Sequence, residues 1–306
     1  MSQDFSTVAL LASIKRRGML PSTDETLATA DFLAIATEEI QSYITELLVS
    51  VREEYAVSSY DVATVVGTEA YRLPPRATGD ALRDVLLSDG QGNYHPLSRV
   101  EPSRRYDYGS TGEASGYVLE DNSVILIPAP STSHTLRMMY FRQPSKLVET
   151  SAVATISSID VTRLIITTTA SIPSTFTSGV VLDVVDEKPG FRCLTIDAAT
   201  TGTVSGTTIT LSSALPSTVE AGDYVCLAGE SPVPQIPVSL HPLLAQRVVV
   251  KCLEALGDKG VNAAKAICDE MRKSAVTLLT PRTQGSARVI VNFNGPGWSR
   301  RTRRRY

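Results

Sequence analysis

The chain has 306 residues, enough for a substantial core and about two domains. Its 42% hydrophobic and 20% charged residues, with a net charge of −3, are ordinary values for a globular protein. The four cysteines are far apart, with no C-x-x-C and no neighbouring histidine, which indicates neither a zinc site nor a disulfide framework and predicts buried, reduced thiols. No apolar run is long enough to span a membrane and no secretory signal opens the chain, so we expect a soluble protein made in the cytosol.

Helical periodicity marks the beginning of the chain. The first helix ends at about Gly18, and Val8, Leu11, Ile14 and Lys15 stand at helical spacing within it. A second helix follows several N-cap residues and runs to about Tyr55. We expect its buried side to consist of Phe32, Ile35, Ile40, Tyr43, Ile44, Leu47 and Leu48, with an acidic opposite side.

The middle of the chain is rich in short extended runs. Residues 63–149 alternate such runs with turn residues such as Asp121 and Asn122, which predicts an antiparallel β meander. Residues 150–235 are dominated by Thr, Ser, Val and Ile, which pack well on a pleated surface and poorly in helices. They predict a small all-β module, a compact barrel or sandwich, inserted into the chain. The predicted strands of the meander are 65–66, 71–73, 85–87, 116–119, 124–127 and 136–141.

After residue 235 the helical signal returns as two apolar stripes with a break at 257–260. This helix pair can close against the N-terminal helices only if the β-rich middle loops out of the bundle. We therefore expect an α+β fold with a discontinuous helical bundle of residues 1–62 plus 236–280, the meander, the inserted module and an extended C-terminal arm, 281–306. The two stripes are Leu240, Leu244, Val248, Cys252, Leu253 and Leu256, then Ala264, Ile267, Met271, Ala275 and Leu278.

The C-terminal arm is basic although the chain as a whole is acidic. It carries seven arginines and no acidic residue, so that without these seven positive charges the net charge of −3 becomes −10. Arginine binds phosphate and carboxylate groups bidentately, so the arm suits nucleic acid or an acidic protein groove. A protein socket also explains the single Trp298 and the β-prone run 288–293, which a partner sheet could accept by strand addition. Attraction to DNA explains only the charge.

The histidines do not indicate an enzyme. His95, His134 and His241 stand in no recognisable catalytic pattern, and no nucleophile elbow occurs among the many serines. His241 precedes Pro242 at a helix start, which favours a capping or first-turn role over catalysis. We therefore expect no catalytic residue and no cofactor.

The clustered carboxylates do not indicate a catalytic site either. Glu38 and Glu39, like the pairs 53–54 and 269–270, are sequence neighbours that point about 100° apart on a helix, so we expect solvated faces. Asp183, Asp186 and Glu187 form the dense acidic set of the inserted module. A weak cation site is one interpretation of that set and a solvated strand end is the preferred one, so we expect no metal.

Several segments, in collinear order, resemble the head-to-tail adaptors of tailed phages, the ring proteins docked beneath the portal. Together they span most of the chain from about residue 20 to residue 280, and the inserted Thr-rich module departs from the simplest adaptors. The segments are 71–76, 96–98, 116–130, 136–147 and 222–230 leading into 237–244.

The resemblance implies a structural virion protein of the neck between capsid and tail. It implies a ring, commonly of twelve subunits, with the helical bundles on the portal, the β domains facing the tail or the outside, and a channel for DNA. The implied partners are the portal protein, a tail or nozzle protein, other copies of this chain and DNA without sequence specificity, with no membrane. The arm would clamp the portal through Arg288, Val289, Ile290, Val291, Phe293, Trp298, Arg300, Arg301, Arg303, Arg304, Arg305 and Tyr306.

Two alternatives remain open. The arginine-rich arm would also suit a DNA-binding accessory protein, whose binding would weaken steeply with salt. The inserted module could be a carbohydrate-binding module, but aromatic platforms for sugar rings are few there. Residues 151–230 contain only Phe176, Phe191 and Tyr224.

Overall fold

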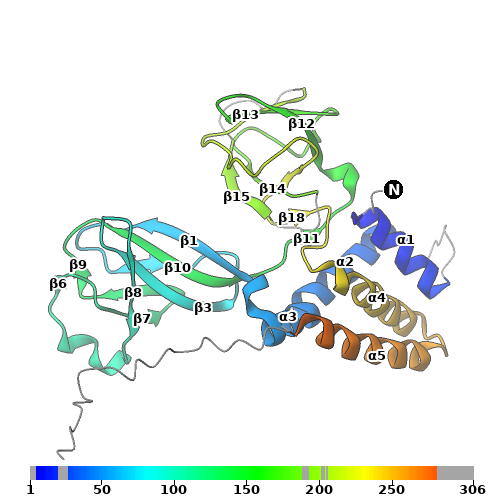
Figure 1. The fold of residues 1–306 in the computed structure, drawn as a ribbon, viewed down its shortest axis with the longest axis horizontal. Helices are drawn as coiled ribbons and strands as arrows, with labels where there is room; N and C mark the ends of the chain where they lie inside the picture. The colour runs from blue at the N-terminus through cyan, green and yellow to red at the C-terminus, as the bar shows by residue number, and fades with distance from the viewer. Residues whose placement is uncertain (1–4, 20–26, 188–192, 201–203, 205, 281–306) are drawn as a thin grey trace, which may run out of the picture.

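The computed structural model describes residues 5–19, 27–187, 193–200, 204 and 206–280. It confirms the α+β class, with helices and mainly antiparallel sheets in separate parts of the molecule. Figure 1 shows three lobes: a helical bundle, an elongated β sandwich and a compact β barrel. No helix of the described residues is long and apolar enough to cross a bilayer.

The helical bundle unites the two ends of the described chain. Its N-terminal part comprises α1 (Thr7–Gly18), α2 (Thr29–Glu39), the π-helix η1 (Ile40–Ile44), α3 (Thr45–Arg52) and the short 3₁₀ turn η2 (Glu53–Tyr55). Its C-terminal part comprises the 3₁₀ turn η5 (Val238–Leu240), α4 (His241–Leu256) and α5 (Val261–Leu279). One continuous apolar core joins both parts, with Ile14 and Phe32 packed in the same cluster as Leu244 and Val248. Because each such side chain stabilises the fold by about 1.5–3 kcal/mol when buried, this core holds the ends together.

Two helices are rotated relative to the predicted stripes. In α1 the buried residues are Thr7, Leu10 and Ile14, whereas Val8 is 53% exposed. Thr7 explains the rotation, since its N–H donates to the Pro232 carbonyl at 2.8 Å and its hydroxyl donates to the Val148 carbonyl at 2.9 Å.

In α5 the predicted Ile267 and Leu278 are 50% and 65% exposed, so this part of the predicted stripe was wrong. The buried face of α5 keeps the predicted Ala264 and Ala275, but takes Cys268 and Leu279, one position later, in place of Ile267 and Leu278. Its members are Ala264, Cys268, Ala275 and Leu279.

The predicted meander folds into two sheets that pack face to face. The first has the order β1-β10-β3-β4 and the second β2-β8-β7-β5. Both contribute side chains to one apolar cluster, with Leu136 and Met138 from the first sheet and Val124 and Leu126 from the second. The strands are β1 (Val57–Ala63), β2 (Ala70–Arg72), β3 (Ala77–Ser88), β4 (Tyr94–Pro96), β5 (Ser98–Arg99), β7 (Gly116–Glu120), β8 (Ser123–Ile127) and β10 (Thr135–Arg142), with the small pair β6 (Thr111–Gly112) and β9 (Ala129–Pro130) and the 3₁₀ turn η3 (Pro102–Asp107) beside them.

Turn chemistry was a good guide in this sandwich, but the first strand was missed. Asp121 and Asn122 both have positive φ, 45° and 56°, as a two-residue hairpin of type I′ between β7 and β8 requires. In contrast, residues 57–62, grouped from sequence with the bundle, form most of β1 and pair with β10. The predicted strand 65–66 is an exposed turn, with Val65 and Val66 59% and 58% exposed.

The inserted module is a β barrel. Its sheet has the order β15-β14-β17-β12-β13-β16, and a bridge between Thr200 and Leu211 joins the two outer strands. The Ser212 N–H also donates to the Ala199 carbonyl at 2.9 Å at this seam. The strands are β12 (Ala154–Ile159), β13 (Ile165–Thr168), β14 (Val181–Val185), β15 (Cys193–Ala199), β16 (Thr208–Thr210) and β17 (Tyr224–Leu227), preceded by the 3₁₀ turn η4 (Thr150–Ala152).

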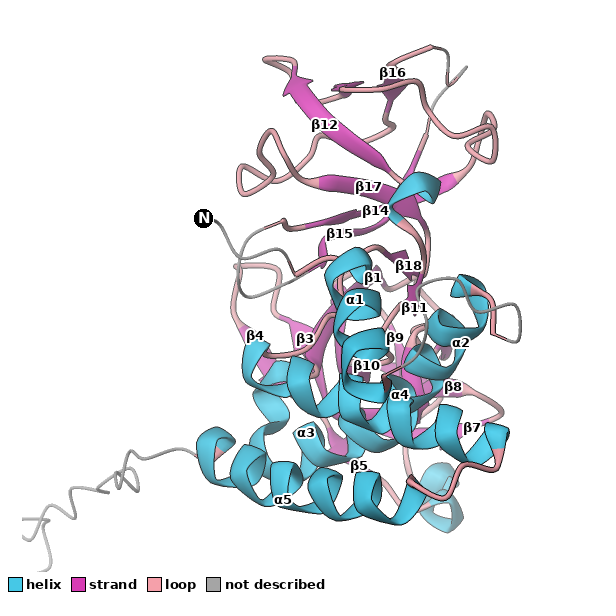
Figure 2. Ribbon diagram, turned by 90° about the vertical axis from the view of Figure 1, so that its right-hand side faces the viewer, coloured by secondary structure: helices cyan, strands magenta, loops and turns pink. Residues whose placement is uncertain are grey.

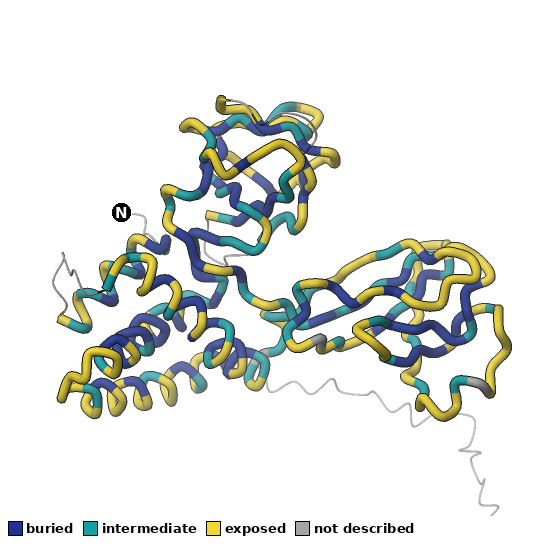
Figure 3. Tube along the Cα trace, turned by 180° about the vertical axis from the view of Figure 1, so that it is seen from behind, coloured by how far each residue is buried: buried dark blue, intermediate teal, exposed yellow. Residues whose placement is uncertain are grey.

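The barrel is attached to the rest of the molecule by a narrow neck. The incoming strand β11 (Lys146–Leu147) pairs in parallel with the outgoing strand β18 (Glu230–Ser231). The Leu147 N–H donates to the Thr37 hydroxyl of α2 at 3.0 Å, which fixes the neck to the bundle. Figure 2 shows β11 and β18 between the barrel and the helices, and Figure 3 shows buried positions on both sides of this neck.

Candidate functional site: the junction of the three modules

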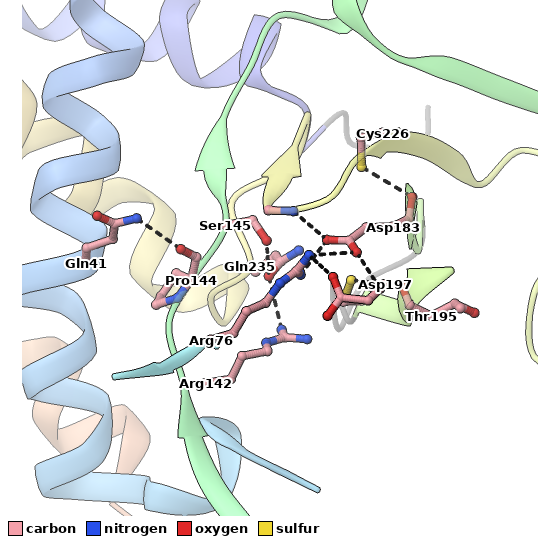
Figure 4. A network of polar contacts seen from close by, with 12 residues as sticks. Gln41, Arg76, Arg142, Pro144, Ser145, Asp183, Thr195, Asp197, Cys226 and Gln235 are labelled. Atoms are coloured by element: carbon pink, nitrogen blue, oxygen red, sulfur yellow. Dashed lines mark hydrogen bonds and ion pairs between the residues drawn. The ribbon is translucent and has the colours of Figure 1, made fainter. Parts of the chain in front are cut away.

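The predicted portal-binding residues lie outside the described residues. All of them belong to the segment 281–306, which directly follows Thr280, the C-cap residue of α5. The described residues hold a different polar site, at the point where bundle, sandwich and barrel meet. Figure 4 shows this junction, with side chains from η1, from the end of β10 and from the barrel strands β14 and β15.

A buried ion pair joins the sandwich to the barrel. Arg76, directly before β3, donates to both carboxylate oxygens of Asp183 in β14, at 2.6 Å and 3.0 Å. The Asp183 side chain is 0% exposed and that of Arg76 is 14% exposed. Burial alone lowers the pKa of Arg76, but the hydrogen bond and charge of Asp183 outweigh burial and raise that pKa. The guanidinium is therefore charged at every pH at which the protein is folded.

The Asp183 carboxylate has further donors from the barrel. It accepts hydrogen bonds from the backbone N–H groups of Gly229 and Asp197, each at 3.0 Å. Asp197 has a positive φ of 56°, and the β14–β15 register shifts beside it, which turns its N–H toward Asp183. Its own carboxylate, 44% exposed, accepts from Arg76 at 2.7 Å. Thus the expectation that Asp183 belongs to a solvated strand end was wrong, because a guanidinium and two N–H groups compensate its burial.

A second set of polar contacts lies on the neck side of the junction. Arg142, the last residue of β10, donates to the Gln235 side-chain oxygen at 3.0 Å. The Gln41 amide of the π-helix η1 donates to the Pro144 carbonyl at 3.2 Å. Each module thus contributes a polar group to the junction, so the arrangement is suited to fixing orientation.

The cysteines at the junction are not nucleophiles. Burial, aided by the nearby Asp183 charge, raises the pKa of Cys193 to about 12. Burial also raises the pKa of Cys226 well above its ordinary value. The thiols of Cys226, Cys252 and Cys268 are buried and free as predicted, whereas Cys193 is half-buried. In the described part of the chain, no group of three His, Cys, Asp or Glu side chains is placed to hold a metal ion.

A polar cluster on the bundle corrects one prediction. Glu39 is 6% exposed, so it does not belong to a solvated face. Arg247 of α4 donates to its carboxylate at 2.8 Å and lies 4.1 Å from the centre of the Tyr43 ring. Burial lowers the pKa of Arg247, but the hydrogen bond to Glu39 outweighs burial and raises it. The Arg272 guanidinium of α5 lies 5.3 Å from the same ring. This cluster stabilises the contact of η1 with α4 and α5.

His241 has the structural role that its position predicts. It begins α4, and its ring meets that of Phe5 edge to face at a centroid distance of 5.8 Å. Burial lowers its pKa to about 4, so the imidazole is neutral in the folded protein near pH 7. His95 is exposed, with its ring 3.9 Å from Asp89, and His134 bonds the Thr132 hydroxyl.

Sequence reasoning missed the Arg76–Asp183 pair, although one local signal pointed to it. Asp183 interrupts the apolar run Val181, Leu182, Val184 and Val185. A charged residue in the middle of such a strand requires a partner when the strand is buried. The identity of the partner was not accessible, because Arg76 lies 107 residues earlier in the chain.

Comparison with protein families gives one match. The family model of the SU10 adaptor protein matches residues 7–181, from the first residue of α1 to the first residue of β14. The match covers more than half of the chain and includes Arg76 of the junction. A search of curated proteins finds no match.

Proposed function

The chain belongs to the SU10 adaptor protein family and is a structural adaptor of a bacteriophage particle; from this membership we propose that it forms a ring between the portal vertex and the tail. The ring surrounds a channel through which DNA passes, and the C-terminal arm clamps the portal. The family match is the observation that carries this proposal.

The end of α5 supports a clamp on the portal. This helix, which precedes the arm in the chain, belongs to the helical bundle and ends beside α3 (Figure 1). If the bundle faces the portal, the arm starts at the surface that it has to grip. Its seven arginines would bind acidic portal groups bidentately, and Trp298 would fill a pocket. The acidic remainder of the chain would repel duplex DNA mildly, which suits a channel wall.

Electron microscopy of the purified protein mixed with its portal tests this proposal, together with size-exclusion chromatography of each protein alone. We expect a monomer or a weak association in isolation and a ring on the portal, because an arm that orders on docking links folding to assembly. Deletion of residues 281–306 should abolish docking while leaving the fold intact. A truncated protein that still formed rings on portals would contradict the clamp.

The arginines also favour a second function, that of a DNA-binding accessory protein. Salt separates the two, since six or more phosphate contacts lose about 10³-fold or more in affinity between 50 and 200 mM salt. A protein socket that holds Trp298 should resist that change. If the protein stays monomeric in the presence of portals and binds DNA with this dependence on salt, the DNA-binding function is correct and the adaptor ring is wrong.

A further inference from the structure

The outer edge of β1 carries backbone groups with no partner among the described residues. Its register with β10 is continuous, and hydrogen bonds from the Arg142 N–H to the Ala56 carbonyl and from the Thr64 N–H to the His134 carbonyl flank the ladder. Hydrogen-bonded and non-hydrogen-bonded pairs alternate in an antiparallel ladder. The N–H and C=O groups of four residues therefore point away from β10. These residues are Val57, Ser59, Asp61 and Ala63.

This edge has none of the usual protection. Edge strands normally avoid further pairing by being short or bulged, or by presenting proline or uncompensated charge. β1 is seven residues long, has no proline or lysine and pairs with β10 without a bulge. Its one charged residue, Asp61, is neutralised by Arg137, which donates to both carboxylate oxygens at 2.7 Å. The edge is thus competent to accept another strand.

A groove lies beside this edge. It contains Ser59, Tyr60 and Asp61 and has a volume of ≈ 530 Å³. Its other walls come from the Pro74–Pro75 turn and from Ile196 in the barrel. Tyr60 is 38% exposed there. Pro74, Pro75 and Ile196 offer apolar surface to a strand that carries Val, Ile and Phe side chains. The same hollow is also lined by the charged side chains of Asp61, Arg76 and Asp197.

The chain that follows the described residues is long enough to bring such a strand to the groove. α5 contacts α3, and Figure 1 shows α5 ending beside α3, from which the chain passes through η2 into β1. Seven residues separate Thr280 from Arg288, a reach of about 25 Å when extended. The run 288–293 has the sequence Arg-Val-Ile-Val-Asn-Phe, rich in residues that favour strands. It therefore lies within reach of β1 in the same chain.

We propose that, in the isolated protein, residues 288–293 pair with the outer edge of β1 of the same chain as an additional strand. The hydrogen bonds of Ser59 and Asp61 would then be made by the chain's own arm, and contact with a portal would draw the arm away. The pairing itself does not depend on the portal. Its test therefore uses the isolated full-length chain, and its failure would leave the portal proposal intact.

Disulfide trapping tests the pairing. Ser59→Cys would be combined in turn with Val289→Cys, Ile290→Cys, Val291→Cys and Asn292→Cys. Successive side chains of a strand point to opposite faces, so we expect an intrachain disulfide at alternate positions and its loss at those between. The control replaces Ser59→Cys by Thr111→Cys, an exposed position on β6 at the far end of the sandwich. Disulfides between chains, which would make a second copy the occupant, or crosslinking without alternation would overturn the proposal.

Hydrogen exchange gives an independent readout in variants of the full chain. Val291→Pro removes a backbone donor from the proposed strand, whereas Ser286→Pro places the same residue just outside it. We expect the Ser59 and Asp61 amides to exchange about tenfold faster in Val291→Pro than in Ser286→Pro, because their hydrogen bonds are lost. Equal exchange rates in the two variants would overturn the proposal.

Discussion

In the helical bundle, segments more than 200 residues apart in sequence meet mainly through apolar side chains, whereas the sandwich and the barrel meet through a buried ion pair. Apolar burial has no preferred direction and scales with the area removed from water. A bidentate pair such as Arg76 with Asp183 requires a defined geometry and is costly when one partner is missing. The apolar core of the bundle therefore holds the two ends of the chain together, and the ion pair at the junction fixes the orientation of the barrel relative to the sandwich.

The largest loss of stability should come from a substitution in the apolar core of the bundle. Phe32 of α2 is 0% exposed and packs among helices from both ends of the chain. Phe32→Ala should lower the free energy of unfolding by about 3–5 kcal/mol, since it removes a large apolar side chain and leaves a cavity. Urea unfolding followed by far-ultraviolet circular dichroism measures the change.

The control for that variant is Leu278→Ala in α5, at a side chain that is 65% exposed. Its effect should stay within about 0.5 kcal/mol, as for other surface substitutions. If the two variants lost similar stability, the assignment of the buried faces of α2 and α5 would be wrong.

The sequence predicted the bundle better than the junction, for a physical reason. Helical periodicity is local, so Leu240, Leu244, Val248 and Cys252 of the α4 stripe are buried as expected, although Leu256 at its end is 41% exposed. In α5 Ala264 and Ala275 are buried as expected, but the predicted Ile267 is exposed and its neighbour Cys268 is buried instead. The junction depends on contacts between segments that are distant in sequence, and local sequence patterns do not predict such contacts.

Strand β1 illustrates the same limit within the sandwich. None of its residues is buried and most are exposed, because it is an edge strand with one unpaired side among the described residues. Such a strand shows neither a continuous apolar run nor a clean alternation. The portal-binding site that the sequence predicts on the C-terminal arm rests on charge and composition alone, and it lies outside the described residues.

The second-largest loss of stability should come from a substitution in the buried ion pair. Asp183→Asn keeps the size of the side chain but leaves Arg76 without its buried carboxylate and places an amide opposite the N–H groups of Gly229 and Asp197. Loss of one partner of a buried pair costs about 3 kcal/mol or more. We expect this loss in urea unfolding, with the barrel separating from the sandwich as an earlier transition.

Asp197→Asn is the matched control, since Asp197 binds the same guanidinium but is 44% exposed. An exposed partner contributes less than about 1 kcal/mol. An equal cost for both variants would show that the burial of Asp183 does not matter to the junction.

The smallest effect concerns a buried histidine of the bundle. His241 has a pKa of about 4 in the folded protein because it is buried, against 6.5 for an ordinary histidine. The unfolded chain therefore binds a proton that the folded protein does not bind between these values, so stability is greatest above pH 6.5 and falls as the pH is lowered toward 4. The loss should approach roughly 2–3 kcal/mol, from about 1.4 kcal/mol for each unit of pKa difference. His241→Gln removes this contribution, and urea unfolding of both proteins from pH 7 to pH 4 isolates it from the carboxylates that they share. Parallel stability curves for the two proteins would mean that the ring opposite Phe5 is not kept neutral by burial, and that the bundle tolerates a charge where its apolar core begins.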